Sequence, residues 1–399
     1  MKALLLGAVG AAGLLCACDD AEYDTLGARA FISESTSSSS RSEKVTITDD
    51  GADVEVTACL SSAVSQDVTL RFEIDESILD TYNKAQASSF VPLPASNFEM
   101  EAEVTIPAGS YSASATRIHI LPLSAEQIGE SYAIPLRLVS VSGGVPVTST
   151  TSTYIITTET VTTSSLPMFI GNAGLTSGEV SLSLPQYTIE CRFQVSNTDN
   201  RNRAVFTNGG SVLLRFEDPQ NDTDGVPAHS YVQFQGEGWY HNPSDYFRTN
   251  KWQHLALTYD GKAITLYVNG AKAGTKEGVC DPTFAILAWF GGDAGGGHGT
   301  GDPAWWAGCK ILCSELRVWS VCRTEAQIQN NMTTTGSSSE GLVGYWRMSS
   351  TWAGTTTENG KTLYTFEDCT GHGYTLKTEV APIWVDGIKS TDTETAWPE

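Results

Sequence analysis

Apolar and polar residues alternate along much of the first 160 residues with the period of a β-strand. Between Val68 and Ile74 every second residue is apolar and the residues between are Thr, Arg and Glu, which is the pattern of a half-buried strand. The one helical pattern runs from Glu76 to Ala85. Further strand-forming runs are Val45–Thr48, Val54–Leu60, Val104–Ile106, Arg117–Leu121, Tyr132–Val139 and Tyr154–Thr157. About seven short strands in about 130 residues predict an immunoglobulin-like β-sandwich.

The strand pattern continues in the second half of the chain and is punctuated by turns. Residues 252–259 place every second apolar residue on one face and end at the tight-turn dipeptide Asp260-Gly261. A return strand over residues 264–268 ends at a second turn, Asn269-Gly270. Thr324 precedes a short helical pattern that its hydroxyl can cap. These segments predict strands and hairpins with little helix.

The distribution of tryptophan divides the chain in two. All ten Trp residues lie between Trp239 and Trp397. Between Thr148 and Ser165, 13 of 18 residues are Ser or Thr, so we place the domain join near residues 160–166. The predicted organisation is a first domain over residues 28–160, a second over 166–388 and a C-terminal tail over 389–399. A chain of 399 residues is long enough for both domains.

The N-terminus has the pattern of a secretory signal. A lysine precedes 13 apolar or glycine residues, Ala3–Leu15, a run that is too short to span a bilayer and typical of a signal peptide. The segment Leu15-Cys16-Ala17-Cys18 resembles the lipobox of bacterial lipoproteins. We therefore expect a signal peptide over residues 1–17, acylation of Cys18 and a tether over residues 18–27. The alternatives are acylation of Cys16 and an ordinary signal peptide with an incidental Cys.

The residues after Cys18 and the net charge bear on location and partners. The acidic run Asp19–Glu22 resembles the signal for export to the outer face in lipoproteins of the Bacteroidetes type. We expect an outer-membrane lipoprotein, exposed at the cell surface and held by its lipid alone. The formal net charge of −22 disfavours nucleic acid and anionic membrane surfaces as partners.

The cysteine pattern contains no metal or redox motif. Nine cysteines are present; Cys16 leaves with the signal peptide and Cys18 takes the lipid, so seven remain, an odd number that leaves at least one thiol free. Cys309 and Cys313 lie in a segment expected to be extended. Their separation of roughly 13 Å would exceed the roughly 7 Å limit for a disulfide, so we expect no bridge between them.

Three segments of the first domain carry a family resemblance. They are Leu93–Phe98, Val104–Gly109 and Tyr132–Leu136. Together they resemble an N-terminal domain of unknown function in Bacteroidetes surface lipoproteins, over roughly residues 28–158. We interpret this domain as a spacer between the membrane and the second domain.

Four landmarks of the second domain resemble the laminin-G-like, concanavalin A-type lectin/glucanase superfamily. They are Trp252–Asp260 with its return strand, Glu315–Trp319, Arg323–Ile328 and Gly341–Trp346. The turn Asp368–Gly373 also fits. The resemblance covers about residues 166–388 and implies a two-sheet antiparallel jelly roll. Trp252, Trp319 and Trp346 lie in these landmarks, so we assign them to the core.

The chain lacks the catalytic pattern of the superfamily's hydrolases. Those enzymes place acidic residues at alternate positions of one strand, because glycoside hydrolysis needs two carboxyl groups facing across the sugar. Glu315 has no acidic residue at position 313 or 317. His254 lies inside a strand landmark, so we expect it to be structural. The sequence therefore predicts no catalytic residues and no enzyme activity.

One loop has some features of a calcium site. Asp218, Asp222 and Asp224 lie in an acidic segment that ends in Gly225 and resembles half of a calcium loop. Gln220 occupies the expected first ligand position and no Glu follows at the usual distance. The two interpretations are a Ca²⁺ site and a solvated acidic loop.

Aromatic residues in two loop-like segments are candidates for glycan binding. Sugar rings pack apolar C–H faces on flat aromatic rings and need polar groups for their hydroxyls. The candidate residues are Trp239, Tyr240, Tyr246, Asp293, His298, Asp302, Trp305 and Trp306, with Asp245 beside them. In an extended segment adjacent side chains point oppositely, so only one of Trp305 and Trp306 is expected to face the core.

The sequence therefore predicts an all-β surface lipoprotein that binds glycan without cleaving it. Such proteins resemble accessory components of polysaccharide capture and uptake, so a glycan and an uptake complex are the expected partners. The alternatives are a protein-binding adhesin and a cryptic glycoside hydrolase. Fold alone does not decide between these functions.

Overall fold

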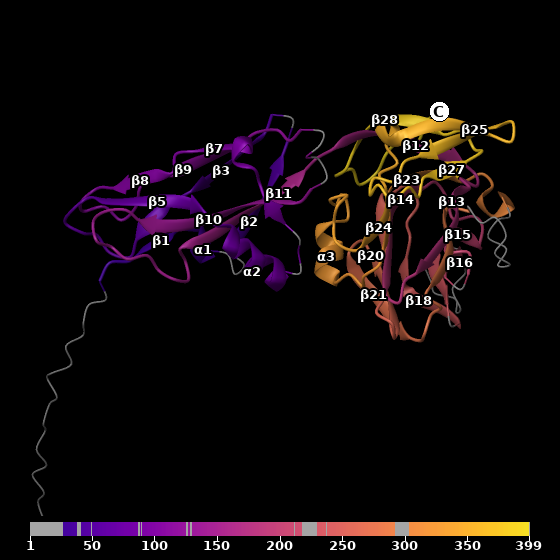
Figure 1. Cartoon of the computed structure of the whole chain (residues 1–399), viewed down its shortest axis with the longest axis horizontal. Helices are drawn as coiled ribbons and strands as arrows, with labels where there is room; N and C mark the ends of the chain where they lie inside the picture. Colours follow the sequence, from indigo (N-terminus) through magenta and orange to yellow (C-terminus); the bar gives the residue numbers. More distant parts are fainter. Residues whose placement is uncertain are drawn as a thin grey trace, which may run out of the picture.

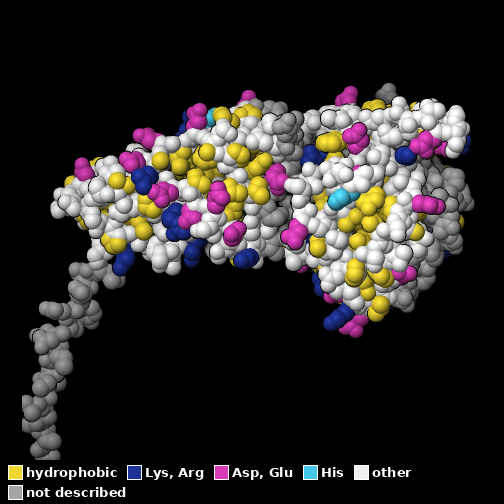
Figure 2. Space-filling view, viewed as in Figure 1, with side chains coloured by type: hydrophobic (Ala, Val, Ile, Leu, Met, Phe, Trp, Pro, Cys, Tyr) yellow, Lys and Arg dark blue, Asp and Glu magenta, His cyan; other side chains and the backbone are white. Residues whose placement is uncertain are grey.

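The computed structural model describes most of the chain. The described residues are 27–37, 41–48, 50–86, 88, 90–124, 127, 130–210, 212–217, 230–236, 238–291 and 303–398, with only the backbone described at 231, 235–236, 238–246 and 303–304. Two β-sandwich domains lie side by side along the long axis of the molecule (Figure 1). Acidic side chains are spread over both domains of the viewed face (Figure 2).

The first domain packs a six-stranded sheet against smaller ones. The larger sheet contains β2 (Ser42–Ile47), β11 (Thr153–Thr160), β10 (Tyr132–Ser140), β5 (Val68–Ile74), β8 (Glu103–Ile106) and β6 (Val91–Pro92). The smaller sheets contain β3 (Ala52–Val56), β9 (Thr116–Ile120) and β7 (Phe98–Met100), and β1 (Ala30–Ile32) with β4 (Ala58–Leu60). Val54 and Ile118 of the three-stranded sheet share one core with Leu70 and Leu136 of the larger sheet. The predicted sandwich is therefore confirmed.

The alternation at residues 68–74 determines which side of β5 faces this core. Val68, Leu70 and Phe72 are buried, whereas Thr69 and Arg71 are only partly covered. The predicted helix is α2 (Glu76–Gln86), whose Leu79 is buried with Ala133 and Ile155. Two short helical turns, α1 (Glu34–Ser37) and η1 (Ala95–Asn97), complete the domain.

The second domain is a two-sheet antiparallel jelly roll. One sheet contains, in order, β21 (Ala271–Glu277), β20 (Ala263–Val268), β19 (Gln253–Tyr259), β14 (Tyr187–Val195), β23 (Lys310–Trp319), β12 (Thr163–Ile170) and β28 (Ile383–Lys389), with β24 (Leu342–Trp346) also paired to β23. The other contains β18 (Gly238–Tyr246), β17 (Tyr231–Gly236), β16 (Leu213–Glu217), β15 (Arg203–Thr207), β22 (Thr283–Trp289), β13 (Leu175–Ser183), β27 (Leu376–Thr378), β26 (Lys361–Phe366) and β25 (Ala353–Glu358).

Strand β14 is buried on both faces. Ile189, Cys191 and Phe193 point into the core between the two sheets. Glu190 and Arg192, which alternate with them, are also buried, on the opposite face of the sheet. Because alternate strand residues point to opposite faces, a second layer of structure must cover the outer face of this sheet. The tryptophans assigned to the core, Trp252, Trp319 and Trp346, are all buried, as predicted.

Turn chemistry explains the hairpin of β19, β20 and β21. The Asp260 carboxylate accepts hydrogen bonds from the backbone N–H groups of Lys262 and Ala263, both 2.8 Å. Asn269 and Gly270 adopt φ values of 52° and 76°, the left-handed conformation that a two-residue hairpin turn requires. The predicted cap is also present, since Thr324 and Gln327 form a capping box at the start of α3 (Glu325–Asn330).

The two domains are joined by residues 161 and 162, between β11 and β12. Helix α3 lies on the side of the second domain that faces the first (Figure 1), and Asn331 Nδ2 donates a 3.3 Å hydrogen bond to Ser131 Oγ across the junction. The longest helix among the described residues is the 11-residue α2, and none of them is long and apolar enough to cross a bilayer. None of the seven cysteines in the described ranges forms a disulfide bond.

Candidate functional site

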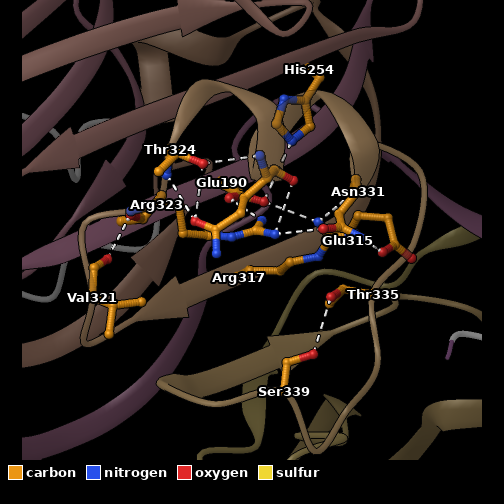
Figure 3. Close-up of polar contacts among 12 residues, drawn as sticks. Glu190, His254, Glu315, Arg317, Val321, Arg323, Thr324, Asn331, Thr335 and Ser339 are labelled. Carbon is orange, nitrogen blue, oxygen red and sulfur yellow. Dashed lines mark hydrogen bonds and ion pairs between the residues drawn. The ribbon is translucent and has the colours of Figure 1, made fainter. Parts of the chain in front are cut away.

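A buried cluster of charged side chains covers part of the outer face of the eight-stranded sheet (Figure 3). At its centre, Glu190 of β14 is fully buried. Its Oε1 lies 2.7 Å from Arg323 Nη1, and its Oε2 lies 3.0 Å from Arg317 Nη1. His254 of β19 lies on the other side, with Nε2 3.7 Å from Glu190 Oε2. The expectation that His254 is structural agrees with this position.

The cluster favours the charged forms of Glu190 and Arg317. Burial opposes ionisation of Glu190, but Arg323, His254 and Arg317 outweigh it, so the pKa of this carboxyl lies well below its ordinary value of 4.5. Burial lowers the pKa of His254 despite Glu190, which leaves the imidazole neutral at neutral pH. Burial also opposes the charge of Arg317, but the surrounding carboxylates, Glu315 first, raise its pKa.

A β-bulge in β23 brings a second carboxylate to the same face. Glu190 pairs with Arg317 and Arg192 pairs with Ser314, so Cys191 opposes two residues of β23. The extra residue is Glu315, whose backbone φ is 55°. Its carboxylate accepts a hydrogen bond from Arg317 and a 2.6 Å hydrogen bond from the Tyr345 hydroxyl. The bulge therefore keeps Glu315 out of the apolar core.

The charged cluster also fastens α3 and the segment after it to the sheet. Arg317 Nη1 donates to the Asn331 backbone oxygen at 2.6 Å, and Arg323 Nη2 donates to Asn331 Oδ1 at 2.7 Å. These residues belong to different landmarks of the sequence. The polar residues of these landmarks meet in one cluster in the folded chain. This accounts for the presence of His254, Arg317 and Arg323 in otherwise apolar segments.

A pocket of about 450 Å³ opens beside this cluster. Its floor is the outer face of the sheet, where Arg192, Ser314 and Glu315 lie next to one another across β14 and β23. The remaining lining residues are Val161, Thr162, Thr163, Ser164, Leu166, Thr333, Thr334, Arg347, Ser349, Thr351, Trp352, Ile388 and Ser390. The lining therefore combines hydroxyl groups, three charged side chains and one large aromatic ring.

The floor residues are built into the fold. Ser314 is buried, and its hydroxyl has no hydrogen-bond partner among the described residues. Arg192 stacks on Trp252 with its Cζ 4.0 Å from the ring centroid. Arg192 Nη2 donates to the backbone oxygens of Lys389 and Asp392 at 3.5 and 3.0 Å. Burial lowers the pKa of Arg192 to about 10, against the effects of Glu315 and Asp392, so the guanidinium stays charged at neutral pH.

The C-terminal segment forms the far side of this arrangement. Gln194 exchanges hydrogen bonds with the backbone of Thr395, 2.7 and 2.8 Å, and the Trp252 indole donates to Thr395 Oγ1 at 2.8 Å. The described part of the predicted tail is thus packed against the sheet. The pocket lies between this segment and the one that follows α3.

Only one of the two neighbouring residues Trp305 and Trp306 faces the core, as predicted, although their backbone is not extended. Residues 303–306 form a 3-10 helix, η2 (Pro303–Trp306). Trp306 is fully buried, and its ring lies 5.9 Å from those of both Phe216 and Phe290. Trp305 is partly exposed. The prediction of Trp306 as a glycan-binding residue is therefore wrong, because its ring fills the core.

The other predicted aromatic segment is a strand, not a loop. Strand β18 includes Trp239, Tyr240 and Tyr246, of which only the backbone is described. Trp239 pairs with Gln235 at one end of β17, and Tyr246 pairs with Tyr231 at the other end. Because these two partners are four positions apart on β17, the two aromatic residues are roughly 13 Å apart.

The strand register also separates Trp239 from Trp305. The Trp305 backbone oxygen accepts a 2.7 Å hydrogen bond from Arg203 Nε. Arg203 of β15 pairs with Phe216 near one end of β16. The next residue of β16, Glu217, pairs with Tyr231 of β17, which in turn pairs with Tyr246 of β18. Trp305 thus shares an end of the sheet with Tyr246, whereas Trp239 lies at the other end, so a single platform does not contain all of these aromatics.

Several predicted residues lie outside the described ranges. They are Cys18, Asp218, Asp222, Asp224, Asp293, His298 and Asp302. The side chain of Asp245 is also outside the description. Within the described ranges, no group of three or more His, Cys, Asp or Glu side chains is arranged to hold a metal ion.

Sequence reasoning missed the pocket on the sheet. A signal was available in β14, where Thr188, Glu190, Arg192 and Gln194 alternate with apolar residues. That pattern marks a polar outer face, but it does not reveal that Trp352 and Thr333 lie beside the same face. Thr333 and Trp352 are 141 and 160 residues from Arg192 in the sequence (333 − 192 and 352 − 192), so their common position at the pocket becomes visible only in the folded chain.

Comparisons with known families match both domains. Residues 169–329 match the family model described as the concanavalin A-like lectin/glucanases superfamily. Residues 23–145 match a family model for an N-terminal domain. No match is found among the curated proteins.

Comparison with solved structures finds a relative of the same two-domain extent. A candidate carbohydrate-binding protein from Bacteroides ovatus is 22% identical, with a TM-score of 0.54, and the match covers 90% of this chain and 97% of the other. A two-domain protein of unknown function from Bacteroides fragilis is 8% identical, with a TM-score of 0.30, over 74% of this chain and 90% of the other. An endoglycosidase of Bacteroides thetaiotaomicron, EndoBT-3987, is 22% identical, with a TM-score of 0.26, over 30% of this chain and 28% of the other.

Proposed function

Because the second domain belongs to the concanavalin A-like lectin/glucanase superfamily, we propose that this protein binds a glycan in the pocket on the outer face of its eight-stranded sheet and does not cleave it. The supporting observation is the floor of that pocket, where Arg192, Ser314 and Glu315 are held side by side by the bulge in β23. The likeness in fold to a candidate carbohydrate-binding protein agrees with this proposal.

The lining has the chemistry that a sugar requires. Sugar hydroxyls need fixed donors and acceptors, and the pocket offers serine and threonine hydroxyls, guanidinium donors and a carboxylate. Trp352 provides an aromatic surface for the apolar face of a sugar ring. Ser314 carries a buried hydroxyl without a partner among the described residues, so a ligand hydroxyl would satisfy it.

The arrangement of carboxylates favours binding over hydrolysis. Glycoside hydrolysis generally uses two carboxyl groups that flank the scissile bond. Among the described residues that line the pocket, Glu315 is the only carboxylate, and it is engaged by Arg317 and Tyr345. Glu190 is fully buried behind it and paired with two arginines, so it cannot face a sugar in the pocket.

The proposal includes the location expected from the sequence. The protein is a lipoprotein acylated at Cys18, displayed on the outer membrane, with the first domain as a spacer. Its role is an accessory one in polysaccharide capture and uptake. The segment that supports the anchor is the 13-residue apolar run before Leu15-Cys16-Ala17-Cys18.

A glycan array probed with the purified protein tests the proposal. We expect retention of at least one glycan class, and loss of that binding when Thr333→Trp fills the pocket. Thr357→Trp is the matched control, since Thr357 is exposed on β25 and does not line the pocket. Unchanged binding by the Thr333→Trp variant, in a protein that still melts like the wild type, would place the glycan site elsewhere.

The same glycans distinguish a binder from an enzyme. Incubation of the wild-type protein with each retained glycan should release no new reducing ends. Turnover that is lost in Glu315→Gln would overturn the non-catalytic interpretation. Binding to host or bacterial proteins, with no glycan retained, would support the adhesin alternative.

A further inference from the structure

One arginine of the pocket floor lies outside the buried ion pairs. In the buried cluster, the carboxylates of Glu190 and Glu315 are matched by the guanidinium groups of Arg323 and Arg317. Arg192 lines the pocket in addition to these pairs, and Glu315 and Asp392 are the acidic groups that act on it. No ion pair within 4 Å joins Arg192 to a carboxylate of the described residues, whereas the chain as a whole has a formal net charge of −22.

Arg192 is positioned to present its charge to a ligand. Its hydrogen bonds to described residues are made to backbone oxygens, and all of them use Nη2. A carbonyl oxygen satisfies a donor without neutralising the guanidinium. Stacking on Trp252 and burial of nearly the whole side chain fix the group at the pocket floor, so little conformational entropy is lost when a ligand binds.

From this geometry we infer that the glycan carries an anionic group, a carboxylate or a sulfate ester, which pairs with Arg192 at the pocket floor while the Ser314 hydroxyl and Arg347 contact it or the adjoining sugar. The inference rests on the proposed function and specifies its ligand. Guanidinium forks match the oxygens of carboxylates and sulfates, and a charge-assisted hydrogen bond is stronger than one to a neutral hydroxyl.

The surroundings favour an anionic sugar over a neutral one. A neutral glycan would leave Arg192, which is buried to more than nine-tenths, without a carboxylate in contact with it, since Glu315 is held by Arg317 and Tyr345 and Asp392 acts on Arg192 only from beyond ion-pair distance. A buried charge that lacks a counter-charge is unfavourable. The acidic surface elsewhere would repel anionic polymers, which makes the pocket the place where an anionic group is accepted.

Matched pairs of polysaccharides test the inference on the purified protein. Polygalacturonate is compared with its carboxyl-reduced form, and chondroitin sulfate is compared with its desulfated, its carboxyl-reduced and its doubly modified forms. Neutral β-glucan and mannan complete the panel. We expect at least tenfold tighter binding to an acidic member than to its neutral counterpart, and a decline in that binding as salt increases. The desulfated and carboxyl-reduced arms show which anionic group is recognised.

Variants connect the preference to the pocket. Arg192→Gln should reduce affinity for the acidic member at least tenfold and abolish the preference over its neutral counterpart. Arg347→Gln, at a less buried position, serves as the second variant should Arg192→Gln fail to fold. Arg117→Gln, an exposed arginine of the first domain, should bind like the wild type.

The outcomes separate this inference from the proposed function. Binding to β-glucan, mannan or the neutral forms without preference for their acidic counterparts overturns the anionic ligand but leaves glycan binding intact. If both the Arg192→Gln and the Arg347→Gln variants still bind the acidic glycan with wild-type affinity, the assignment to this pocket is overturned. Absence of binding to every member of the panel counts against both proposals.

Discussion

At the scale of single residues, Glu190 is the buried charge that depends most on its neighbours. Its carboxylate is removed from water, and Arg323, Arg317 and His254 surround it. An isolated buried charge is costly, and its loss leaves the partner charges unmatched. The group is therefore a structural requirement for attaching α3 to the sheet.

We predict that Glu190→Gln lowers the free energy of unfolding by about 3 kcal/mol at pH 7, because it leaves buried guanidinium groups without their counter-charge. Urea denaturation measures the change. The exposed carboxylate of Glu358, which pairs with Lys377, provides the control, since Glu358→Gln should cost less than about 1 kcal/mol. Equal stability of the two variants would contradict the structural role.

The effect of Glu190 should also depend on pH. Its pKa in the folded protein is lower than the ordinary value of 4.5. The stabilisation is therefore fully present above about pH 4.5 and decreases as the pH falls below it toward the folded pKa. The difference in unfolding free energy between the wild type and Glu190→Gln should accordingly shrink in the acid range. A difference that stays constant down to pH 3 would contradict the lowered pKa.

Trp305 and Trp306 are neighbours in the chain but differ in burial, so their contributions to stability should differ. Trp306 fills the core beside Phe216 and Phe290, so Trp306→Ala should cost about 3–5 kcal/mol. Trp305 is partly exposed, so Trp305→Ala should change stability by less than about 1 kcal/mol. Thermal and urea unfolding of both variants measure this. A similar loss in the two variants would show that both rings are structural.

At the scale of elements, a bulge and a short helix shape the outer face of the sheet. If Glu315 continued β23 as a regular strand residue instead of forming a bulge, it would point into the core and Leu316 would point out of it. Helix α3 then covers the polar face that the bulge creates. The six-residue helix is too short to be stable alone, so it depends on its cap and on Arg317 and Arg323.

We predict that Thr324→Ala lowers the free energy of unfolding by about 1 kcal/mol, because it removes the hydroxyl that accepts from the Gln327 backbone N–H. Thr324→Ser retains a capping hydroxyl and should stay within a few tenths of a kcal/mol of the wild type. Urea denaturation compares the three proteins. Wild-type stability in Thr324→Ala would mean that tertiary contacts alone hold α3 in place.

At the scale of the whole molecule, the pocket lies at the junction of two domains. Val161 and Thr162 of the connection line it from one side, and Thr333 and Thr334 line it from another. A second cavity of about 280 Å³ shares Thr333 and Thr334 and extends to residues of the first domain, including Tyr82 and Ser131. The first domain therefore lines the neighbouring cavity, which shares Thr333 and Thr334 with the pocket.

The anchor is the prediction that concerns the protein as a whole. Cys18→Ala should abolish lipid labelling and release the protein from the membrane fraction, because acylation supplies the expected attachment. Cys16→Ala is the matched control and should remain labelled and membrane-bound. Acylation that persists in Cys18→Ala but is lost in Cys16→Ala would move the lipid to the other cysteine.

The sequence by itself determined several of the strands, two turns and the helix cap, because each depends on residues that are neighbours in the chain. The alternation at residues 68–74, the Asn269-Gly270 turn and the Thr324 cap all correspond to the structure. The landmarks of the second domain likewise identified its superfamily. Alternation and turn conformation are local properties, so local pattern is sufficient to predict them.

Only the tertiary structure decided which of these residues meet. The burial of Trp306, the distance between Trp239 and Trp305, and the approach of Arg192 to Ser314 all depend on strand register across the sheets. Register is determined by long-range packing, and the single extra residue Glu315 shifts it locally. The pocket floor arises in this way, because β14 and β23 are distant in the chain and are brought together by the core beneath them.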